Sequence, residues 1–179
     1  MANYSWLEIY SMLKYKREHL ISPGMREHDM VKLRRCSCEN SDFIELVKLL
    51  DADLALRDGE DHAFYSQFNK IGNIRFVVMA YENERASGCG ALKEYSDDTM
   101  EIKRIYVLPE SRKKGIASEI LSELENWTRE LSFSKCILET GKMQPEAIGL
   151  YLKNGYNIIP NYGQYAGMEN SVCFEKVIV

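Results

Sequence analysis

The chain has 179 residues, of which 45% are hydrophobic and 28% charged, with a formal net charge of −4 at pH 7. This length predicts one globular domain with a modest extension, and the acidic balance argues against a nucleic-acid partner, whose binding depends on clustered lysine and arginine. No window approaches the roughly 18 consecutive apolar residues of a membrane-spanning helix, and the five cysteines follow no zinc or disulfide spacing, so we expect a cytoplasmic protein with reduced thiols, no metal site and no membrane partner.

The first predicted element is a helix at residues 5–21, which we assign to an N-terminal helical extension covering residues 1–29. Its apolar side chains recur at helical spacing, and Ser5 with Glu8 forms an S-x-x-E capping box. Ser-Pro-Gly then ends the helix. Its aromatic face either packs on the remaining domain, residues 30–179, or contacts a second chain, which leaves a homodimer open.

The first half of the domain is predicted to combine strands with helices. A strand at 31–36 precedes a helix at 41–50, and the mixed stretch 53–69 indicates an acidic turn that opens a second, short helix. A hairpin follows, with strands at 74–81 and 86–94. The two hairpin strands must be antiparallel.

The second half is predicted to hold four more strands and two more helices. Its clearest element is the helix at 118–131, whose apolar residues keep one face while glutamates keep the other. The other elements are strands at 100–108, 135–139, 156–159 and 171–177 and a helix at 145–153. The full order predicts an α/β (α+β) fold with one mixed sheet, parallel where a helix intervenes and antiparallel at the hairpins, and with helices on its faces.

The most informative segment is IYVLPESRKKGIASEIL at residues 105–121, where a predicted buried strand leads through a basic loop into the clearest helix. Gly115 lacks a Cβ, so the backbone can approach a ligand closely, and the helix start offers N–H groups without intrahelical partners. The helix dipole and the charges of Arg112, Lys113 and Lys114 add to this anion site, which suits a pyrophosphate. The alternative is a basic helix start that binds no ligand.

Within this segment, VLPESRKKGIA resembles the acyl-CoA signature of the GNAT family of N-acetyltransferases, R/Q-x-x-G-x-G/A, which Arg112, Gly115 and Ala117 meet. A second segment, QPEAIGLYLKNGY at 144–156, is similar to the family's NxxAxxLYxKxGF. The resemblance implies a GNAT-like acyl-CoA N-acyltransferase fold, in which a mixed, mostly antiparallel central sheet splays at the cofactor cleft with helices on both faces. It also implies acetyl-CoA as the cofactor.

The resemblance implies two kinds of contact with the cofactor. Free backbone groups of Ile105, Tyr106 and Val107 would pair with the pantetheine arm of the cofactor as a strand would. The pyrophosphate would lie against Arg112, Lys113, Lys114, Gly115, Ile116, Ala117 and Ser118. Gln144 stands where the family has Asn, and its longer side chain leaves a direct cofactor contact open.

Two residues are the catalytic candidates. Tyr151 occupies the position of the family tyrosine that protonates the departing thiolate, and the alternative is that it packs in the core beside Leu150. Glu101 lies where several members of the family place a general base. A base is required because only a neutral amine can attack a thioester, so an ammonium substrate must first lose a proton. The alternative for Glu101 is an ion pair with Lys103 or Arg104.

The resemblance places the acceptor between the stretch 50–69 and the loop 160–171. Carboxylates and aromatic rings in these segments suit a cationic amine through charge and cation–π contacts. The candidates are Asp58, Glu60, Asp61, His62, Tyr65, Tyr162 and Tyr165. The alternatives are an ordinary acidic helix start and a solvent-facing loop.

The sequence therefore predicts an acetyl-CoA-dependent N-acetyltransferase that moves an acetyl group to a primary amine of a small molecule or peptide by direct transfer in a ternary complex. No cysteine lies beside a histidine in the sequence, which argues against a covalent acyl-enzyme. The alternative is a noncatalytic acyl-CoA-binding or partner-binding module that retains the cofactor cleft. The positions of Glu101 and Tyr151 discriminate between the two.

Overall fold

The computed structural model describes residues 31–72 and 74–178, so the predicted N-terminal helix lies outside the described residues. The α-helices in this part of the chain are α2 (Ser41–Asp58), α3 (His62–Tyr65), α4 (Ile116–Glu130) and α5 (Pro145–Lys153). The strands are β1 (Val31–Cys36), β2 (Phe76–Glu82), β3 (Arg85–Ser96), β4 (Thr99–Val107), β5 (Lys135–Gly141), β6 (Asn157–Ile159) and β7 (Ser171–Val177). Within the described residues, helices and strands follow one another in the predicted order.

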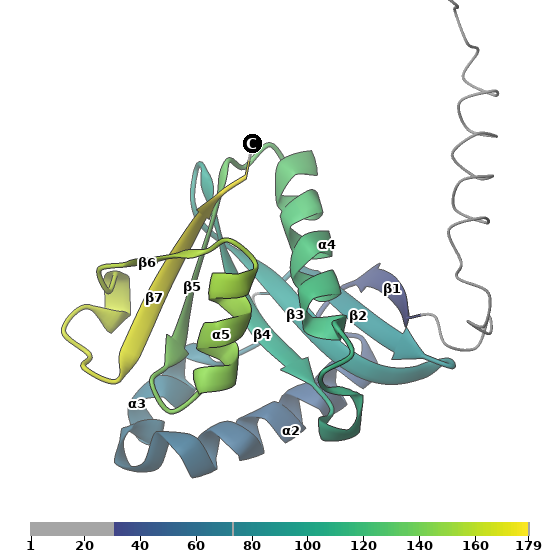
Figure 1. Cartoon of the computed structure of the whole chain (residues 1–179), viewed down its shortest axis with the longest axis horizontal. Helices are drawn as coiled ribbons and strands as arrows, with labels where there is room; N and C mark the ends of the chain where they lie inside the picture. Colours follow the sequence, from purple (N-terminus) through teal and green to yellow (C-terminus); the bar gives the residue numbers. More distant parts are fainter. Residues whose placement is uncertain (1–30, 73, 179) are drawn as a thin grey trace, which may run out of the picture. The chain divides into compact units, whose positions relative to one another are not determined.

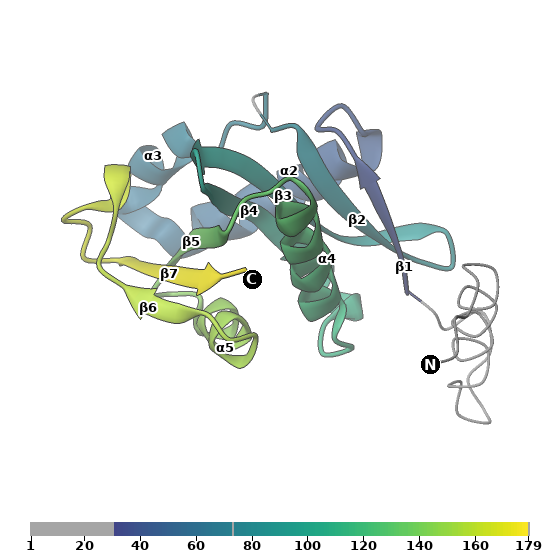
Figure 2. The ribbon, with the colours of Figure 1, turned by 90° about the horizontal axis from the view of Figure 1, so that it is seen from above.

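These strands form one sheet in the order β1-β2-β3-β4-β5-β7-β6 (Figure 1). β4 and β5 are parallel, as the intervening helix α4 requires, and the other neighbours are antiparallel. α4 and α5 cover one face of the sheet, and α2 and α3 cover the other (Figure 2). The predicted fold class is confirmed.

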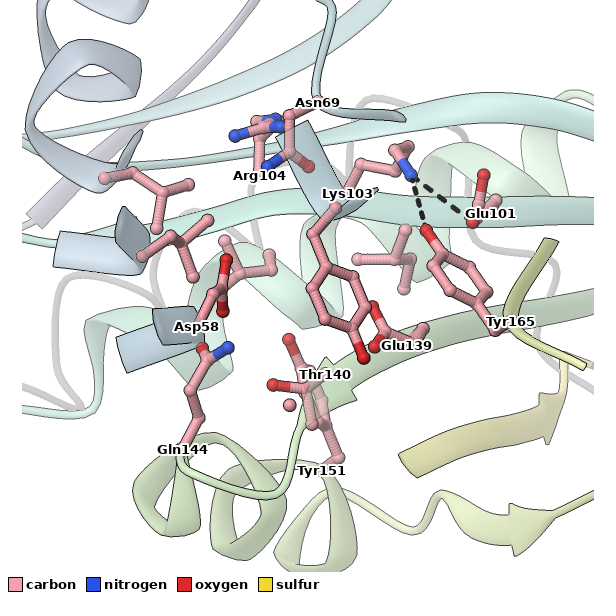
Figure 3. A pocket seen from close by; sticks show the side chains of 16 residues that line it. Asp58, Asn69, Glu101, Lys103, Arg104, Glu139, Thr140, Gln144, Tyr151 and Tyr165 are labelled. Carbon is pink, nitrogen blue, oxygen red and sulfur yellow. Dashed lines mark hydrogen bonds and ion pairs between the residues drawn. The ribbon is translucent and has the colours of Figure 1, made fainter. Parts of the chain in front are cut away.

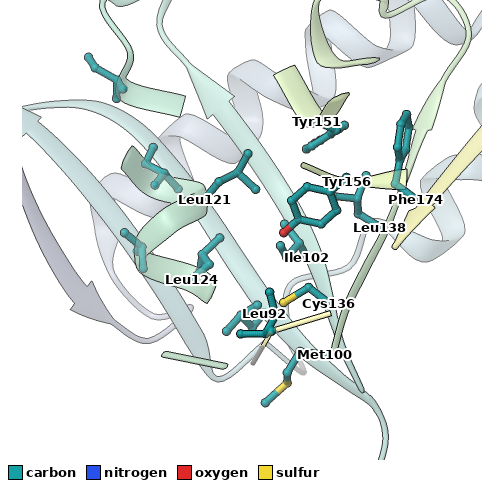
Figure 4. Packing of buried hydrophobic residues seen from close by; sticks show 14 of the residues in the cluster. Leu92, Met100, Ile102, Leu121, Leu124, Cys136, Leu138, Tyr151, Tyr156 and Phe174 are labelled. Atoms are coloured by element: carbon teal, nitrogen blue, oxygen red, sulfur yellow. The ribbon is translucent and has the colours of Figure 1, made fainter. Parts of the chain in front are cut away.

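The alternation of side chains along β2 shows how the two faces are filled. Val78 and Ala80 are fully buried in the cluster that includes the helices α4 and α5. Val77 and Met79, also fully buried, lie in the cluster that includes α2. Successive strand residues point to opposite faces, so a strand covered on both sides is apolar throughout. In the first cluster, leucines of α4 pack near Tyr156 (Figure 4).

The sheet splays between β4 and β5. In the described chain these strands pair at three positions, the last of them Glu101, and they part beyond it. Between Lys103 and Tyr106, β4 also carries an irregularity in its pairing with β3, where Arg104 adopts a φ of 60°. Such a bulge bends a strand. The backbone of β4 from 102 to 107 therefore faces a space that β5 does not fill.

The structure corrects the predicted end of the first helix, because α2 continues past Leu50 to Asp58. Most residues beyond Leu50 are good helix formers, and the helix ends where Gly59 takes a φ of 55°. Apolar periodicity detects a helix by its buried face. The last part of α2 has little such face, since Leu56 is 86% exposed, so the pattern gave no signal there.

Candidate active site

A cleft of about 500 Å³ opens where β4 and β5 part. Its walls are the free edge of β4, the start of α4, one side of α5 and the middle of α2. Of the predicted cofactor-binding residues, the following line it: Ile105, Tyr106, Val107, Arg112, Lys113, Gly115, Ile116, Ala117, Ser118 and Gln144. Lys114 is the predicted residue outside this lining.

The start of α4 presents backbone amides to the cleft. The helix begins at Ile116, earlier than the predicted Ser118, and its N-cap residue Gly115 has a φ of 90°. The amides of Ser118 and Glu119 donate to the Gly115 carbonyl, so the amides before them have no intrahelical partner. A Cβ on Gly115 would meet no atom within 4 Å. Free amides beside open space form a site suited to an anion.

The three basic residues before Gly115 differ in their contacts. Arg112 Nε donates to the Val107 carbonyl at 3.0 Å, which holds the loop to the end of β4. Lys114 pairs with Glu82 at 2.8 Å, away from the cleft. Lys113 is exposed and lines the cleft. Lys113 is therefore the lysine of this loop that is placed to meet a negatively charged ligand in the cleft.

A smaller pocket of about 90 Å³ adjoins the cleft (Figure 3). The two cavities share Leu50, Ile105 and Gln144 in their walls. The predicted catalytic and acceptor-binding residues that line the smaller pocket are Asp58, Tyr65, Glu101, Tyr151 and Tyr165. The fold thus brings residues from α2, α3, β4, α5 and the loop before β7 to one cavity.

Glu101 lines this pocket but is already engaged. Its carboxylate lies 3.4 Å from Lys103 Nζ and accepts a hydrogen bond of 3.3 Å from the Tyr162 hydroxyl. Glu101 and Lys103 are two positions apart on β4, so their side chains share a face of the strand. The lysine also donates to the Tyr165 hydroxyl (Figure 3). The ion pair that the sequence left open is present, with Lys103 as the partner.

Arg104, the other partner that the sequence offered to Glu101, pairs instead with Asp51 of α2 at 2.6 Å. Its positive φ places it in the bulge of β4. The side chain is 2% exposed. This ion pair fastens α2 to the bulged part of the strand.

The contacts of Tyr151 are compatible with both roles that the sequence left open, a proton donor at the site and a residue packed in the core. Its ring packs against Tyr156 and Phe174, with centroids 5.9 and 5.5 Å away. The same residue lines the smaller pocket, although it is only 6% exposed. Burial raises the pKa of the Tyr151 phenol, with a smaller contribution from the charge of Glu139. Tyr151 is therefore a core residue that also forms part of the pocket wall.

Glu139, which is not among the residues predicted from the sequence, lines the pocket from β5. The Ser171 hydroxyl donates to its Oε1 at 2.6 Å, and the Tyr65 hydroxyl lies 2.9 Å from the same serine oxygen. Burial raises the pKa of Glu139 to about 7, against the opposing effects of Ser171 and Lys103. The sequence did hold a hint of Glu139, since this carboxylate interrupts an apolar strand. Its position opposite β4, however, is evident only once β4 and β5 are seen to part.

The remaining acceptor candidates lie around the pocket and outside its lining. Tyr162 reaches Glu101 and packs edge-on against Tyr165, with centroids 5.6 Å apart. His62 Nδ1 is 3.4 Å from Asp58, and Asp61 accepts a hydrogen bond of 2.6 Å from Asn170. Glu60 is exposed. Of the acidic cluster 58–62, the pocket contains only Asp58.

Residues 31–72 and 74–178 contain no group of three or more histidine, cysteine and acidic side chains arranged to hold a metal ion. None of the helices within these ranges has the length and apolar character needed to cross a bilayer.

Comparison with known proteins assigns the chain to a family. A sequence profile of the acetyltransferase (GNAT) family matches residues 43–156. The uncharacterized N-acetyltransferase YjgM of Escherichia coli (strain K12) is 32% identical over 111 residues, which are 61% of this chain and 66% of YjgM. The IAA acetyltransferase of Azospirillum brasilense is 33% identical over 105 residues, 58% of this chain and 68% of that protein. The chain thus spans about two thirds of the length of each relative.

Solved structures agree with the fold. A structure from Klebsiella pneumoniae, provisionally described as an acyl-CoA N-acyltransferase, is 26% identical and has a TM-score of 0.70, covering 84% of this chain and 99% of that one. The PaiA N-acetyltransferase of Thermoplasma acidophilum, solved in complex with coenzyme A, has the same fold with a TM-score of 0.62 at 18% identity, covering 83% of this chain and 99% of that one. The predicted family is confirmed: the chain belongs to the acetyltransferase (GNAT) family, and the relative YjgM that it matches is named as an N-acetyltransferase.

Proposed function

We propose that this protein transfers an acetyl group from acetyl-CoA to a primary amine of a small molecule or peptide, directly and within a ternary complex. The observation that carries the proposal is the pair of adjoining cavities at the splay. The larger one has an amide-lined anion site and suits an elongated nucleotide cofactor, whereas the smaller one suits the end of an acceptor. Their shared walls, at Leu50, Ile105 and Gln144, mark the place where the two substrates would meet.

The residues of the larger cleft fit coenzyme A. The backbone of residues 105–107 lies at the unfilled edge of β4 and offers hydrogen bonds to the amides of a pantetheine arm. The amides at the start of α4, with Lys113 beside them, suit the pyrophosphate. Bound there, acetyl-CoA supplies an acetyl thioester, whose carbonyl carbon an amine can attack.

We assign to Tyr151 the proton that the departing sulfur requires. Because burial raises its pKa, the phenol holds that proton across the physiological pH range. The same burial would raise the basicity of a thiolate formed beside the phenol, so the pKa values of the phenol and the thiol stay close enough for proton transfer. Tyr151 also lines the smaller pocket, which we call the acceptor pocket.

For Glu101 the contacts favour the ion pair over the general base. Its carboxylate is already held by the Lys103 ammonium group and by the Tyr162 hydroxyl. We propose that Glu101 orients Lys103, which in turn donates to the hydroxyl of Tyr165. Glu101 would then be a positioning residue for one side of the pocket.

The noncatalytic alternative requires that Glu101 and Tyr151 be confined to ion pairs and core. Both have such contacts, but both also line the acceptor pocket. That second fact supports the enzyme. We place the activity in the cytoplasm because all five cysteines are free thiols, as a reducing compartment maintains them.

The experiment that tests the proposal is an initial-rate study with both substrates varied. A panel of primary amines is first screened with acetyl-CoA by following free thiol, with tertiary amines as the control. Direct transfer predicts that the double-reciprocal plots intersect, because both substrates must be bound together. Parallel lines, or acetylation of the protein in the absence of amine, would indicate a covalent acyl-enzyme and contradict the ternary complex.

A further inference from the structure

The charged residues of the acceptor pocket fall into two groups. Lys103 and Arg104 bring the positive charges, and each is already paired, with Glu101 at 3.4 Å and with Asp51 at 2.6 Å. Arg104 Nη2 has no hydrogen-bond partner, but it is sealed from solvent. Both cationic side chains of this pocket are therefore already paired with carboxylates of the protein.

Two carboxylates remain, Asp58 from α2 and Glu139 from β5, and both line the pocket (Figure 3). In the described part of the chain, neither has a lysine or arginine within ion-pair distance. Asp58 lies 3.4 Å from His62 Nδ1, and Glu139 accepts its hydrogen bond from the neutral hydroxyl of Ser171. Burying carboxylates without a countercharge is costly unless a cation binds among them.

We propose that the acceptor is bound as a primary ammonium ion between Asp58 and Glu139, and that Glu139 takes the proton which the ammonium must lose before it reacts. This inference rests on the proposed function, and it names both the acceptor class and a further catalytic residue. Asp58, on α2, would pair with the positive charge of the ammonium ion, on the other side from Glu139 of β5. Tyr65, hydrogen-bonded to Ser171, fixes the serine that orients the Glu139 carboxylate.

The proton and bond changes balance. An N–H proton of the ammonium passes to the free carboxylate oxygen of Glu139 and from there to solvent. The nitrogen lone pair then forms the bond to the acetyl carbon as the carbon–sulfur bond breaks. The sulfur takes the proton of Tyr151, and the second proton lost by the nitrogen restores the phenol. The net products are an N-acetyl amide, free coenzyme A and one proton.

Glu139 suits this step better than Glu101 because its carboxylate lacks a cationic partner. Its pKa of about 7 supports the assignment, since a general base works best near the operating pH. The groups that influence Glu139 or are influenced by it come from every surrounding element: Asp58 of α2, Tyr65 of α3, Glu101 and Lys103 of β4, Tyr151 of α5, Tyr165 of the loop, and Ser171 and Cys173 of β7.

The test uses the full chain and the small primary amines n-butylamine and benzylamine. We expect Glu139→Gln to lower kcat/KM at least 100-fold at pH 7.5 and to remove the rise in kcat/KM with pH that is centred near 7. Asp58→Asn should raise KM for the amine about tenfold and change kcat less. The matched control is Glu175→Gln, since Glu175 pairs with Lys135 outside the pocket.

Two further measurements separate the possible failures. His62 lies beside Asp58 at the edge of the pocket, so His62→Asn must keep the pH dependence if Glu139 causes it. Calorimetry with coenzyme A should give the parent affinity for Glu139→Gln, which shows that the variant is folded. If Glu139→Gln keeps the parent kcat/KM within threefold and keeps its pH profile, the assignment of Glu139 is wrong while the acetyltransferase proposal stands.

If the wild-type chain acetylates neither amine, carbon-13 NMR of the Glu139 carboxyl provides the readout. Titration near pH 7 in the complex with coenzyme A, displaced on addition of n-butylammonium, supports the proposal. Titration near 4.5, the ordinary value for a glutamate, with no response to the ammonium ion would overturn it. Loss of coenzyme A binding in the wild-type chain would count against the proposed function itself.

Discussion

At Gly115 the backbone conformation and the proposed anion site depend on the same missing side chain. Its φ of 90° strains any other residue by about 1–3 kcal/mol, and the space beside it is open. We predict that Gly115→Val abolishes coenzyme A binding while the fold survives, because branched carbons would occupy the space of the phosphate. Lys114→Ala is the matched control, since Lys114 points to Glu82. Calorimetric titration with coenzyme A measures both, and an unchanged affinity in Gly115→Val would refute the pyrophosphate site.

Tyr151 and Tyr156 form a matched pair for testing the proton donor. Both rings are buried in the same cluster, 5.9 Å apart, but the pocket is lined by Tyr151 and not by Tyr156. Tyr151→Phe should lower kcat at least tenfold with coenzyme A affinity retained, because the lost proton matters in the transition state. Tyr156→Phe should leave kcat unchanged and stability equal or higher, since the Tyr156 hydroxyl is buried without a partner. Full activity in Tyr151→Phe would leave Tyr151 as a core residue alone.

Glu139 also makes a prediction about stability. Its pKa is about 7 in the folded chain and near 4.5 when unfolded, so between these values the folded state binds more protons. The free energy of unfolding should therefore fall as pH rises from 4.5 to 7, by at most about 1.4 kcal/mol per pH unit from this group. Urea unfolding of Glu139→Gln should lack this component and gain stability relative to the parent above pH 7. A constant difference between the two chains across that range would contradict the raised pKa.

At the scale of elements, the contact between α4 and β3 depends on Gly90. A Cβ there would lie 2.5 Å from Ile105 Cδ1 and 2.7 Å from Ile120 Cγ2. We predict that Gly90→Ala destabilises the fold by about 1–3 kcal/mol, because overpacking pushes α4 and β4 apart. Gly149→Ala in α5 is the control, since its Cβ would meet nothing within 4 Å, and it should stabilise by up to about 1 kcal/mol. Equal effects of the two substitutions in urea unfolding would show that α4 tolerates displacement.

The elements themselves were largely predictable, and the reason lies in their buried faces. The helix α5 begins and ends where the sequence predicts, because proline and Asn-Gly mark its ends. The last strand, β7, is also confirmed at Ser171–Val177. The end of α2 was not predicted, because its final turns carry exposed side chains and no periodic signal. Local patterns therefore locate packed elements and miss helical extensions that cover a cavity.

The candidate site was predictable where it is local in sequence and hidden where it is assembled by the fold. All the predicted cofactor-binding residues except Gln144 come from the continuous segment 105–118, and the structure places all but Lys114 of the predicted set in one cleft. The acceptor pocket instead combines residues from α2, α3, β4, β5, α5 and the loop before β7, so no spacing along the chain reveals it. For this reason the sequence offers Asp58 only as one of several neighbouring acidic residues, and Glu139 was not among the predicted residues.

At the scale of the whole molecule, the site lies where, among the described strands, one parallel pair interrupts an otherwise antiparallel sheet. The crossover through α4 positions that helix start beside the end of β4, and the bulge at Arg104 opens the space between the strands. Arg57 of α2 bridges the opening by pairing with Glu146 of α5 at 2.5 Å. Both cavities are thus consequences of the topology, with side chains supplying the charge and the proton transfer.

The most direct test of acetyl transfer to an amine is to quantify both products of one reaction. Incubation with acetyl-CoA and a primary amine should release free thiol and form N-acetyl amide, identified by mass spectrometry, in equal amounts and at a rate that depends on the amine. Gly115→Val should form neither. Tight binding of coenzyme A with no amine-dependent thiol release, across a panel of primary amines of different size and charge, would contradict the enzyme and support the noncatalytic module.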